Sequence, residues 1–584
     1  MSVSVLKQTK YLTKIIFMVG VIFTWVAFIS AYFVNIPVAN AANIVSAANI
    51  TSTDNIDDFL SAYPDLSQIQ AALFQRKFSC QQLIAGYMNR IKLYNLTTNN
   101  SLAPINAITQ LNSQALIEAA QLDTKFQANK IRAGDLFCIP VIVKDNIDVM
   151  GLRTSSGSLS LLGTYPLTDS AIVHNIKSKG GIIIAKSAMD EMASGLYGIS
   201  SLSGRVGNAY ITSYNPGGSS SGSAVSVASG FAPLAIGSDN SGSVRIPAAY
   251  NGIYGLRPTY GLISHAGIFP AGNLDGTAGP MAGNVNDLAK LLAVMVGLKV
   301  DYYSHSLKES SLSGKHFAVI KSVAGKSLWD GMPKPVALIY NNVKLNLQKQ
   351  GATIIELDLP GYNLERKNNM AGTVDEVNLY LANNISSISQ LREICNGNSR
   401  VFGMSKQCLK FIDHIKSTNS PEYKQVVYNI SRNQVYISTI MQQYGLDGLI
   451  LPSGKMGIAS YGAENINLQS VIASNSGLPE ITLPVAQYHG LPVGLDILGS
   501  KYAESALLGY AYAYEKNYYN FKAPKLIADS QFNSWSISKL NTLYTLIGKI
   551  SFDTIIKPSN HNKITPLQST IVTNKAVSMM KREL

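Results

Sequence analysis

The chain has 584 residues and a formal net charge of +13, and 46% of its residues are apolar, which is ordinary for a soluble globular protein. A positive balance of this size can mark a nucleic-acid or membrane surface, but no dense run of Lys and Arg with interleaved aromatics occurs, so we expect no nucleic-acid partner. No Cys-x-x-Cys or Cys/His spacing suggests a metal site, so we expect neither a metal nor another cofactor.

The first 41 residues have the pattern of an export signal, which would be removed from the mature protein. Three lysines between residues 7 and 14 form a positive region, residues 15–34 are almost wholly apolar, and Ala39-Asn40-Ala41 gives a small-x-small cleavage site. The apolar run is about 20 residues long, just enough to span a bilayer, so an uncleaved anchor is the alternative. Both interpretations predict an exported protein, periplasmic or secreted, that contacts a membrane only if this segment is kept.

Beyond a lead-in at residues 42–56, the hydrophobic pattern alternates between helical and strand-like segments. Apolar residues recur at helical spacing in three segments, 66–73, 83–91 and 284–296. Short apolar runs predict strands at 105–108, 141–143 and 182–185. This alternation predicts an α/β fold with a large mixed, mostly parallel central sheet covered by helices on both faces.

The stretch from Asn215 to Pro258 holds two Gly/Ser loops around a run of small apolar residues. A flexible linker is the ordinary meaning of a Gly/Ser tract, but residues 224–236 are too apolar to border a solvated tether. We instead predict a closely packed helix that leads into a buried strand ending at Gly237. Loops at the ends of these elements would present hydroxyls and backbone N–H groups to a ligand.

Together with Lys144, this stretch resembles the amidase signature family. Lys144 follows the apolar residues 139–143, Ser219 lies in a Gly-Gly-Ser-Ser loop, and Ser243 lies in an Asp-x-x-Gly-Ser-x-Arg loop at 239–245. Lys144 and Ser219 are 75 residues apart, and Ser219 and Ser243 are 24 apart, which is typical of the family. The resemblance runs from about residue 57 to about residue 516 and implies the amidase signature fold.

The resemblance implies an amide-hydrolysing enzyme that works through an acyl-enzyme and a Ser-cisSer-Lys triad. Ser243 would attack the amide carbonyl, Ser219 would relay the proton after a cis peptide bond, and neutral Lys144 would be the base. Burial at the end of an apolar strand would lower the pKa of Lys144 and keep it neutral. None of the seven histidines lies in a motif typical of a catalytic triad.

The resemblance also assigns supporting roles around these three residues. The oxyanion would be held by four backbone N–H groups, those of Asn240, Ser241, Gly242 and Ser243. Gly218 would leave room for the cis bond, and Asp239 and Arg245 would support the loop. The substrate would be a small-molecule or peptide amide.

Two residues depart from the family pattern, because Ser221 and Ser241 stand where glycine is most often found. Ser241 is the more serious departure. Its Cβ lies in the predicted oxyanion loop, where it would narrow the carbonyl pocket or demand an uncommon backbone conformation.

Three alternative functions remain open. Residues 218–222 also fit the Gly-x-Ser-x-Gly nucleophile elbow of an esterase, with Ser220 as the nucleophile and His489 or another histidine in the triad. The amidase subunit of a tRNA-dependent amidotransferase shares the signature, although an export signal argues against a cytosolic tRNA partner. A secreted binding protein that has lost catalysis would account for the two departures.

We expect the amidase domain to span residues 57–526, within which residues from about 301 to 442 follow the family only loosely and would shape the substrate side. Residues 527–584 have no counterpart and are expected to form a partly ordered extension of unknown role. The four cysteines suit an oxidising compartment, and Cys395 and Cys408 are the best candidates for a disulfide, with two free thiols as the alternative.

Overall fold

The computed structural model describes residues 55–97, 103–128, 136–270, 274–305, 307–366, 368–396, 412–453, 470–518, 521–551 and 566–582. Residues Asp54–Leu584 form one compact unit. The predicted signal segment lies outside the described residues. None of the helices in the described segments combines the length and the apolar character needed to cross a membrane.

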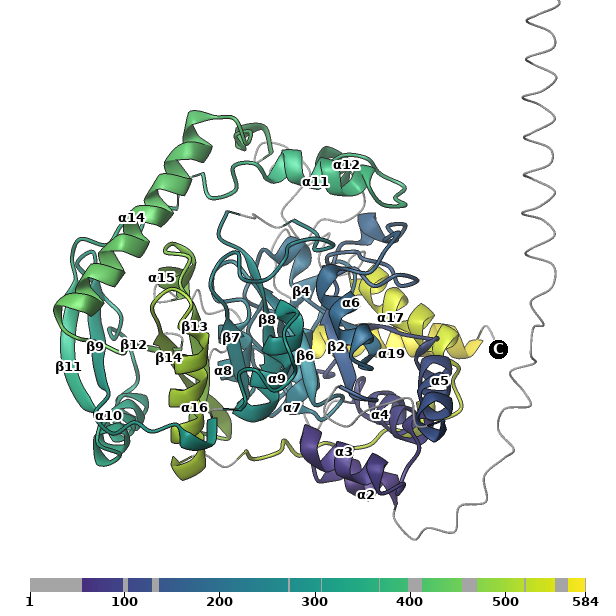
Figure 1. The fold of residues 1–584 in the computed structure, drawn as a ribbon. Coiled ribbons are helices and arrows are strands. Elements are labelled where there is room, and N and C mark those ends of the chain that lie inside the picture. The colour runs from purple at the N-terminus through teal and green to yellow at the C-terminus, as the bar shows by residue number, and fades with distance from the viewer. Residues whose placement is uncertain are drawn as a thin grey trace, which may run out of the picture. The chain divides into compact units, whose positions relative to one another are not determined.

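One large sheet runs through this unit (Figure 1). Its 12 described strands follow the order β1-β3-β2-β6-β8-β7-β13-β14-β12-β9-β10, and β11 pairs with β9. The strand bounds are β1 Ile108–Leu111, β2 Pro140–Lys144, β3 Ile182–Ser187, β6 Leu234–Asp239, β7 Tyr254–Arg257, β8 Thr277–Ala282, β9 His316–Val323, β10 Lys326–Ser327, β11 Thr353–Leu359, β12 Gly448–Pro452, β13 Glu480–Tyr488 and β14 Leu491–Leu498. A separate small sheet pairs β4 (Ile199–Ser200) with β5 (Gly204–Arg205).

The sheet is mixed, as predicted, but antiparallel pairs are more frequent among the described strands than expected. β2 runs parallel to β3 and β6, and β9 runs parallel to β11 and β12. The other pairs are antiparallel. Antiparallel neighbours need no crossover helix, and β13 and β14 are joined by only two residues, His489 and Gly490.

The strand predicted at residues 105–108 is displaced in the structure. β1 begins only at Ile108 and ends at Leu111. Asn106 has a φ of +48°, which an extended strand does not adopt. The predicted strands at 141–143 and 182–185 are confirmed as β2 and β3.

Helices pack on both faces of the sheet. α6, α9 and α16 form one contacting group and α7 and α8 form another, and both groups contact sheet strands (Figure 1). The helix bounds are α2 Ile56–Ser61, α3 Leu66–Phe74, α4 Cys80–Tyr94, α5 Ala115–Gln127, α6 Ala171–Ser178, α7 Ser221–Ala228, α8 Arg245–Tyr250, α9 Val285–Val296, α10 Lys334–Lys349, α11 Thr373–Ala382, α12 Leu391–Asn396, α14 Pro421–Gln443, α15 Ser470–Ser474, α16 Glu504–Tyr518, α17 Ile537–Ser551 and α19 Pro566–Arg582.

α7 and β6 occupy the Gly/Ser-rich stretch, and every residue of both is buried, as predicted. Gly222 allows α7 to pack this closely, because a Cβ there would lie 2.3 Å from Ala107 O. β6 ends at Asp239, two residues beyond the predicted end. Since β2 and β6 are parallel neighbours, Lys144 and Asp239 emerge at the same edge of the sheet.

The divergent region continues the sheet. β9 and β11 pair beyond β12, and α10 packs on β11. α14 is a long helix that begins at Pro421 after an N-cap at Ser420. These elements place the divergent residues beside the sheet that carries the Gly/Ser loops.

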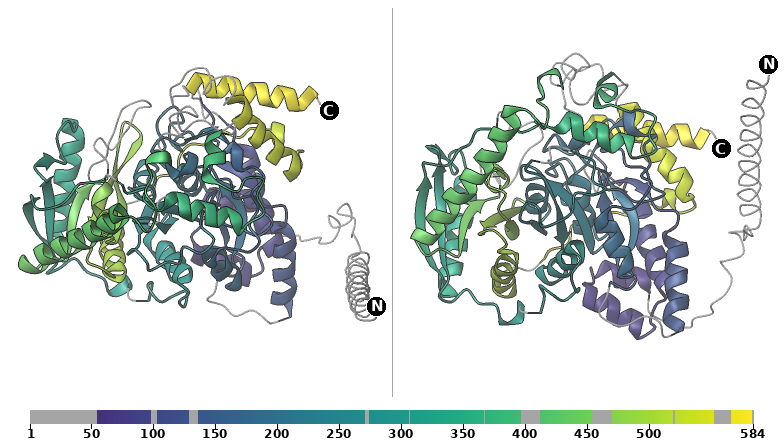
Figure 2. Two further views of the ribbon diagram at one scale, coloured as in Figure 1. Left: turned by 90° about the horizontal axis from the view of Figure 1, so that it is seen from above. Right: turned by 45° about the horizontal axis from the view of Figure 1, so that its top comes forward.

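Much of the C-terminal extension is helical and packs on the main body. α17 contacts β1, and α19 contacts α17. The two helices are drawn in yellow near the C-terminus in Figure 2. Asn541 on α17 accepts a hydrogen bond from Leu111 N at 2.7 Å and donates one to Leu111 O at 3.0 Å. The extension is thereby attached to the strand at one end of the sheet order.

A disulfide that the sequence analysis did not predict joins Cys80 to Cys138, with their Cα atoms 5.6 Å apart. It ties the start of α4 to the turn before β2. Cys395 also takes part in a disulfide. Its predicted partner, Cys408, lies outside the described residues.

Candidate active site

Lys144 is the last residue of β2 and is completely buried. Its Nζ lies 2.7 Å from Ser219 Oγ, 2.8 Å from Ser238 Oγ and 3.3 Å from Ser238 O. A neutral amine has two hydrogens and one lone pair, so it can donate to both oxygens of Ser238 and accept from the Ser219 hydroxyl. These contacts suit a lysine that takes a proton from Ser219.

Burial lowers the pKa of Lys144 to about 7, although the Asp190 and Asp239 carboxylates act in the opposite direction. Among the described residues, no carboxylate lies within ion-pair distance of its Nζ. The charged form therefore loses hydration without gaining a direct counter-ion. A substantial fraction of the amine is neutral at neutral pH.

The loop that carries Ser243 lies against the segment that carries Ser219. Ser219 follows Gly218 through a cis peptide bond, and Ser220 N donates to Ser243 O at 3.1 Å. The Ser243 hydroxyl makes no hydrogen bond within the described part of the chain. Lys144 and Ser219 are thus in direct contact, and main-chain bonding holds Ser243 beside them.

The loop from Asp239 to Arg245 folds around a buried carboxylate. Asp239 Oδ1 accepts from Gly242 N at 2.8 Å, and Oδ2 accepts from Val244 N at 3.1 Å. Gly242 has a φ of +101°, and a Cβ there would lie 2.6 Å from Ser470 Cβ, so only glycine fits.

This folding removes one member, Gly242, from the predicted set of four oxyanion donors. The Gly242 N–H is already bound to Asp239, because the ionised carboxylate attracts the nearest amide groups of its own loop. The N–H groups of Ser241 and Ser243 have no acceptor among the described residues. The Ser241 and Ser243 amides are therefore free to donate to a ligand.

Asp239 and Arg245 support the loop through a buried ion-pair network. Arg245 Nε and Nη2 each donate to an Asp239 oxygen at 3.1 Å, and Arg245 Nη1 lies 2.9 Å from Glu480 Oε1. Burial opposes the ionisation of Asp239, but the Arg245 and Arg257 guanidinium groups outweigh it and hold the pKa of Asp239 well below its usual range. The carboxylate therefore stays charged at working pH.

Gly218 is required by the space around it. A Cβ on Gly218 would lie 2.0 Å from Asp190 Oδ2 and 3.0 Å from the Leu196 backbone. Asp190 is itself fixed, since it accepts backbone hydrogen bonds from Tyr197, Gly198 and Ile199. This packing holds the segment before Ser219 in place.

Sequence reasoning missed three residues of the site. Ser238 bonds Lys144, Asp190 packs on Gly218, and Arg257 on β7 donates to Asp239 O and lies 3.5 Å from Asp239 Oδ1. Ser238 directly precedes the Asp239 motif, and its position in β6 was the one available signal. Asp190 and Arg257 come from segments that meet the loop only in the folded chain.

The esterase alternative receives no geometric support. Ser220 is buried, and its hydroxyl donates to Ser238 O and accepts from Ser238 N, both at 3.2 Å. His489 lies in the exposed turn between β13 and β14, with its ring against Tyr488. Within the described residues, no histidine bonds Ser220.

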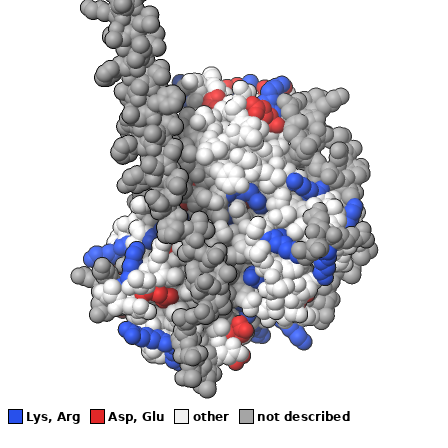
Figure 3. All heavy atoms as spheres, turned by 90° about the vertical axis from the view of Figure 1, so that its right-hand side faces the viewer, with Lys and Arg blue, Asp and Glu red and all other residues white. Residues whose placement is uncertain are grey.

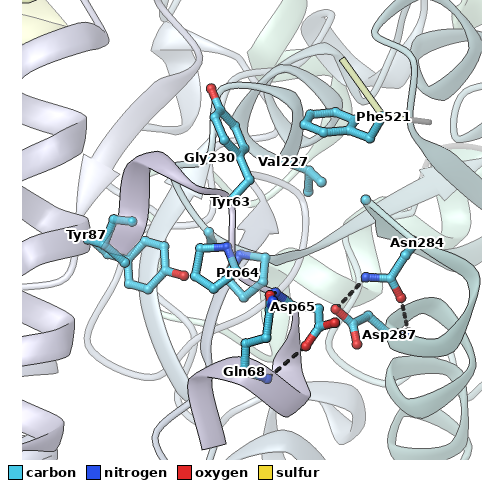
Figure 4. A pocket seen from close by; sticks show the side chains of 14 residues that line it. Tyr63, Pro64, Asp65, Gln68, Tyr87, Val227, Gly230, Asn284, Asp287 and Phe521 are labelled. Atoms are coloured by element: carbon cyan, nitrogen blue, oxygen red, sulfur yellow. Dashed lines mark hydrogen bonds between the residues drawn. The ribbon is translucent and has the colours of Figure 1, made fainter. Parts of the chain in front are cut away.

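A cavity elsewhere in the fold contains none of the candidate catalytic residues (Figure 4). It lies at the end of β6 away from Asp239 and is lined by Tyr63, Tyr87 and Asp287, among others.

The distribution of surface charge matches the diffuse positive charge expected from the sequence. Lys and Arg side chains are scattered among neutral residues on the face shown in Figure 3.

Three kinds of comparison place the chain among known proteins. The amidase family model matches residues 82–508. A glutamyl-tRNA(Gln) amidotransferase subunit from Streptococcus pneumoniae (strain 70585) is 30% identical, with 77% of this chain and 95% of that protein covered.

Solved structures give the same result. The peptide amidase from Stenotrophomonas maltophilia is 26% identical with a TM-score of 0.69, and the match covers 80% of this chain and 99% of that chain. An amidase family protein from Bacillus anthracis str. Ames is 27% identical with a TM-score of 0.68, covering 82% and 96%. This chain belongs to the amidase family and is an amide-hydrolysing serine enzyme.

Proposed function

We propose that the protein is an exported amidase that cleaves a carbon–nitrogen amide bond through Ser243, Ser219 and Lys144. The observation that carries this proposal is the 2.7 Å contact between Lys144 Nζ and Ser219 Oγ, made by a buried lysine beside the loop of Ser243. A relay serine bonded to a neutral amine can accept the proton of a second serine while it gives up its own.

The reaction has two halves. Ser243 Oγ attacks the amide carbonyl, its proton passes to Ser219, and the Ser219 proton passes to Lys144. The tetrahedral oxyanion is bound by the N–H groups of Ser241 and Ser243, each worth about 3–4 kcal/mol by analogy with other hydrolases. The carbon–nitrogen bond then breaks, and the leaving amine takes the proton back from Lys144 through Ser219.

Water completes the second half by attacking the acyl-enzyme ester. It gives one proton to the same Ser219–Lys144 pair, and Ser243 leaves with that proton restored. The products are a carboxylic acid, which releases its remaining proton to solvent and becomes a carboxylate, and an amine or ammonia. The substrate class that we propose is a small-molecule or peptide amide, and the similarity to a peptide amidase supports this choice.

Export is part of the proposal. The lysines before residue 15, the apolar residues 15–34 and the cleavage site at 39–41 motivate it. The Cys80–Cys138 disulfide supports it, because disulfides persist in oxidising compartments and are rare in the cytosol.

A second candidate is the amidase subunit of a tRNA-dependent amidotransferase. The 30% identity to an amidotransferase subunit favours it, and that protein's name implies work with a tRNA substrate. For this chain we propose no nucleic-acid partner. Two features argue against that role for this chain. They are the export pattern and the lack of a dense basic run with interleaved aromatics.

The test of the function uses the Ser243→Ala variant and a panel of amides with an ammonia or amine readout. Ser243→Ala should abolish hydrolysis while leaving the melting temperature nearly unchanged, because only one hydroxyl is removed. The matched control is Ser229→Ala. Ser229 is also buried, but it is the C-cap of α7, at the end of this helix away from Ser219. Its hydroxyl has no hydrogen-bond partner among the described residues.

Labelling identifies the nucleophile independently of the substrate. A fluorophosphonate should form its adduct on the peptide that carries Ser243, as read by mass spectrometry. An adduct on Ser220 would support the esterase, and activity confined to glutamine would support the amidotransferase. Absence of both labelling and hydrolysis would support the binding protein that has lost catalysis.

A further inference from the structure

We propose that Arg366, in the divergent region, is a positioning residue that holds the oxyanion loop through the side chain of Ser241. This inference rests on the proposed amidase function. It explains why a serine at position 241, where the family pattern has glycine, is useful. Its hydroxyl accepts a hydrogen bond from Arg366, which glycine could not do, and this bond would fix the position of the loop.

The contact to the loop is direct. Arg366 Nη2 donates to Ser241 Oγ at 2.8 Å and lies 2.9 Å from Asp275 Oδ2. Arg366 Nη1 donates to Asn475 Oδ1 and lies 3.5 Å from Ser474 Oγ. One guanidinium therefore joins the loop to the segments before β8 and after α15.

Asp275 restrains the contact between Arg366 and the loop. It is 2% exposed, and its Oδ2 also accepts from Asn369 Nδ2 at 3.1 Å. Its Oδ1 lies 3.4 Å from Asn240 Nδ2, and its carbonyl accepts from Arg257. The side chains of Asn240 and Ser241, adjacent in the loop, are thus anchored to one buried carboxylate, directly or through Arg366.

The backbone beside Arg366 is also fixed by the divergent region. Asn363 N donates to Asn433 Oδ1 at 2.9 Å, and Asn433 Nδ2 donates back to Asn363 O at 2.8 Å. Asn433 lies on α14 and is buried. The side chain of Arg366 therefore extends from an anchored backbone towards the loop.

Both terminal nitrogens of Arg366 are occupied by protein groups, which favours positioning over substrate binding. Its side chain is 28% exposed. Ser241 does not adopt a positive φ, so replacing glycine has not forced the loop into a left-handed conformation. The serine keeps an ordinary backbone, and its hydroxyl gains a charged donor.

The expected consequence is a precise direction for the Ser241 N–H, which we assign to the oxyanion hole. A donor that must match the transition state loses much of its effect when it is slightly misplaced. Releasing Ser241 Oγ should therefore slow the chemical step and leave the affinity for substrate largely unchanged.

The experiment is a double-mutant cycle of Ser241→Ala and Arg366→Met, with kcat and KM measured per Ser243 titrated by fluorophosphonate. We expect kcat to fall about 10-fold for Ser241→Ala and about 100-fold for Arg366→Met, with KM within about 3-fold. The double variant should fall no further than Arg366→Met, whereas independent effects would multiply to about 1000-fold. The midpoint of the pH–rate profile should stay where it is in the unmodified enzyme.

Arg392→Met is the matched control, because Arg392 is an exposed arginine of the same region that pairs with Asp413. It should keep the unmodified kcat. If Arg366→Met fails to fold because Asp275 loses its counter-ion, Ser241→Ala alone must still lower kcat with KM unchanged. A loss confined to KM, multiplying effects or an unchanged kcat in Ser241→Ala would each overturn the proposal.

Hydrogen exchange separates this inference from the proposed function. Amides of residues 239–245 should exchange faster in Arg366→Met than in Arg392→Met, whether or not a substrate is known. An enzyme that neither hydrolyses amides nor labels at Ser243 would refute the function, and with it the catalytic part of the inference. Active enzyme with equal exchange in both variants would refute the inference alone.

Discussion

Two buried lysines on neighbouring strands differ in what surrounds the amine. Lys186 on β3 donates to Ile147 O and lies 3.3 Å from Thr154 Oγ1, and burial, opposed by Asp145 and Asp148, lowers its pKa to about 8. Lys144 has a similarly lowered pKa but bonds two serine hydroxyls. Burial makes both amines easier to deprotonate, and the contact with Ser219 is the reason that we propose Lys144, and not Lys186, as the base.

The pH dependence of hydrolysis tests Lys144. Since only the neutral amine accepts a proton and burial lowers the pKa of Lys144 to about 7, the rate should rise with pH through about 7 and then level off. Lys144→Ala should lower the rate by about 10²- to 10⁴-fold. Lys144→Arg should be equally inactive, because guanidinium stays protonated.

Rates of both variants and the unmodified enzyme on one amide, from about pH 5 to 10, provide the measurement. Substantial activity in Lys144→Arg would rule out the Ser-Ser-Lys assignment. A fall in the rate of the unmodified enzyme through about pH 7 would also contradict a neutral lysine base.

Local motifs predict the two serines and the lysine as candidate catalytic residues, because the spacing and the residue types can be read directly from the sequence. They did not locate Asp190 or Arg257, whose importance comes from contacts made across the fold. The prediction of a free Gly242 N–H is wrong, because the sequence does not show which way the Asp239 carboxylate turns.

At the scale of elements, the sequence predicts the type and burial of three elements well, namely α7, β6 and β2. Their runs of small or β-branched residues are suited to buried positions. The direction of strand pairing was predicted less well. Parallel pairing was expected from alternation alone, yet β13 and β14 turn back through two residues. The Cys80–Cys138 disulfide was equally hard to predict, since 58 residues separate the two cysteines.

The Cys80–Cys138 bond should stabilise the join between α4 and β2. A closed loop of this length is worth about 4 kcal/mol, chiefly by restricting the unfolded chain. The Cys80→Ala, Cys138→Ala double variant should therefore unfold at lower urea concentration, while hydrolysis at 25 °C persists because Lys144 lies at the far end of β2. Equal urea midpoints for the double variant and the unmodified protein would show that the bond does not form in solution.

At the scale of the whole molecule, export is open to a direct test. If the N-terminal pattern is a cleaved signal, protein recovered from the periplasm or medium should begin at or near Ala42. N-terminal sequencing gives the answer, and a membrane-bound chain that retains residues 15–34 would indicate the anchor. Soluble cytosolic protein that begins at Met1 would contradict export and favour the amidotransferase.

The position of α17 against β1 has a consequence for shortening the chain. β1 ends the strand order at one side, and Asn541 occupies both main-chain groups of Leu111 there. A bare strand edge can recruit strands from other molecules, and natural proteins commonly cover such edges. An expression product trimmed to residues 57–526 would retain the catalytic residues but lose this cover, so its yield would be limited by aggregation.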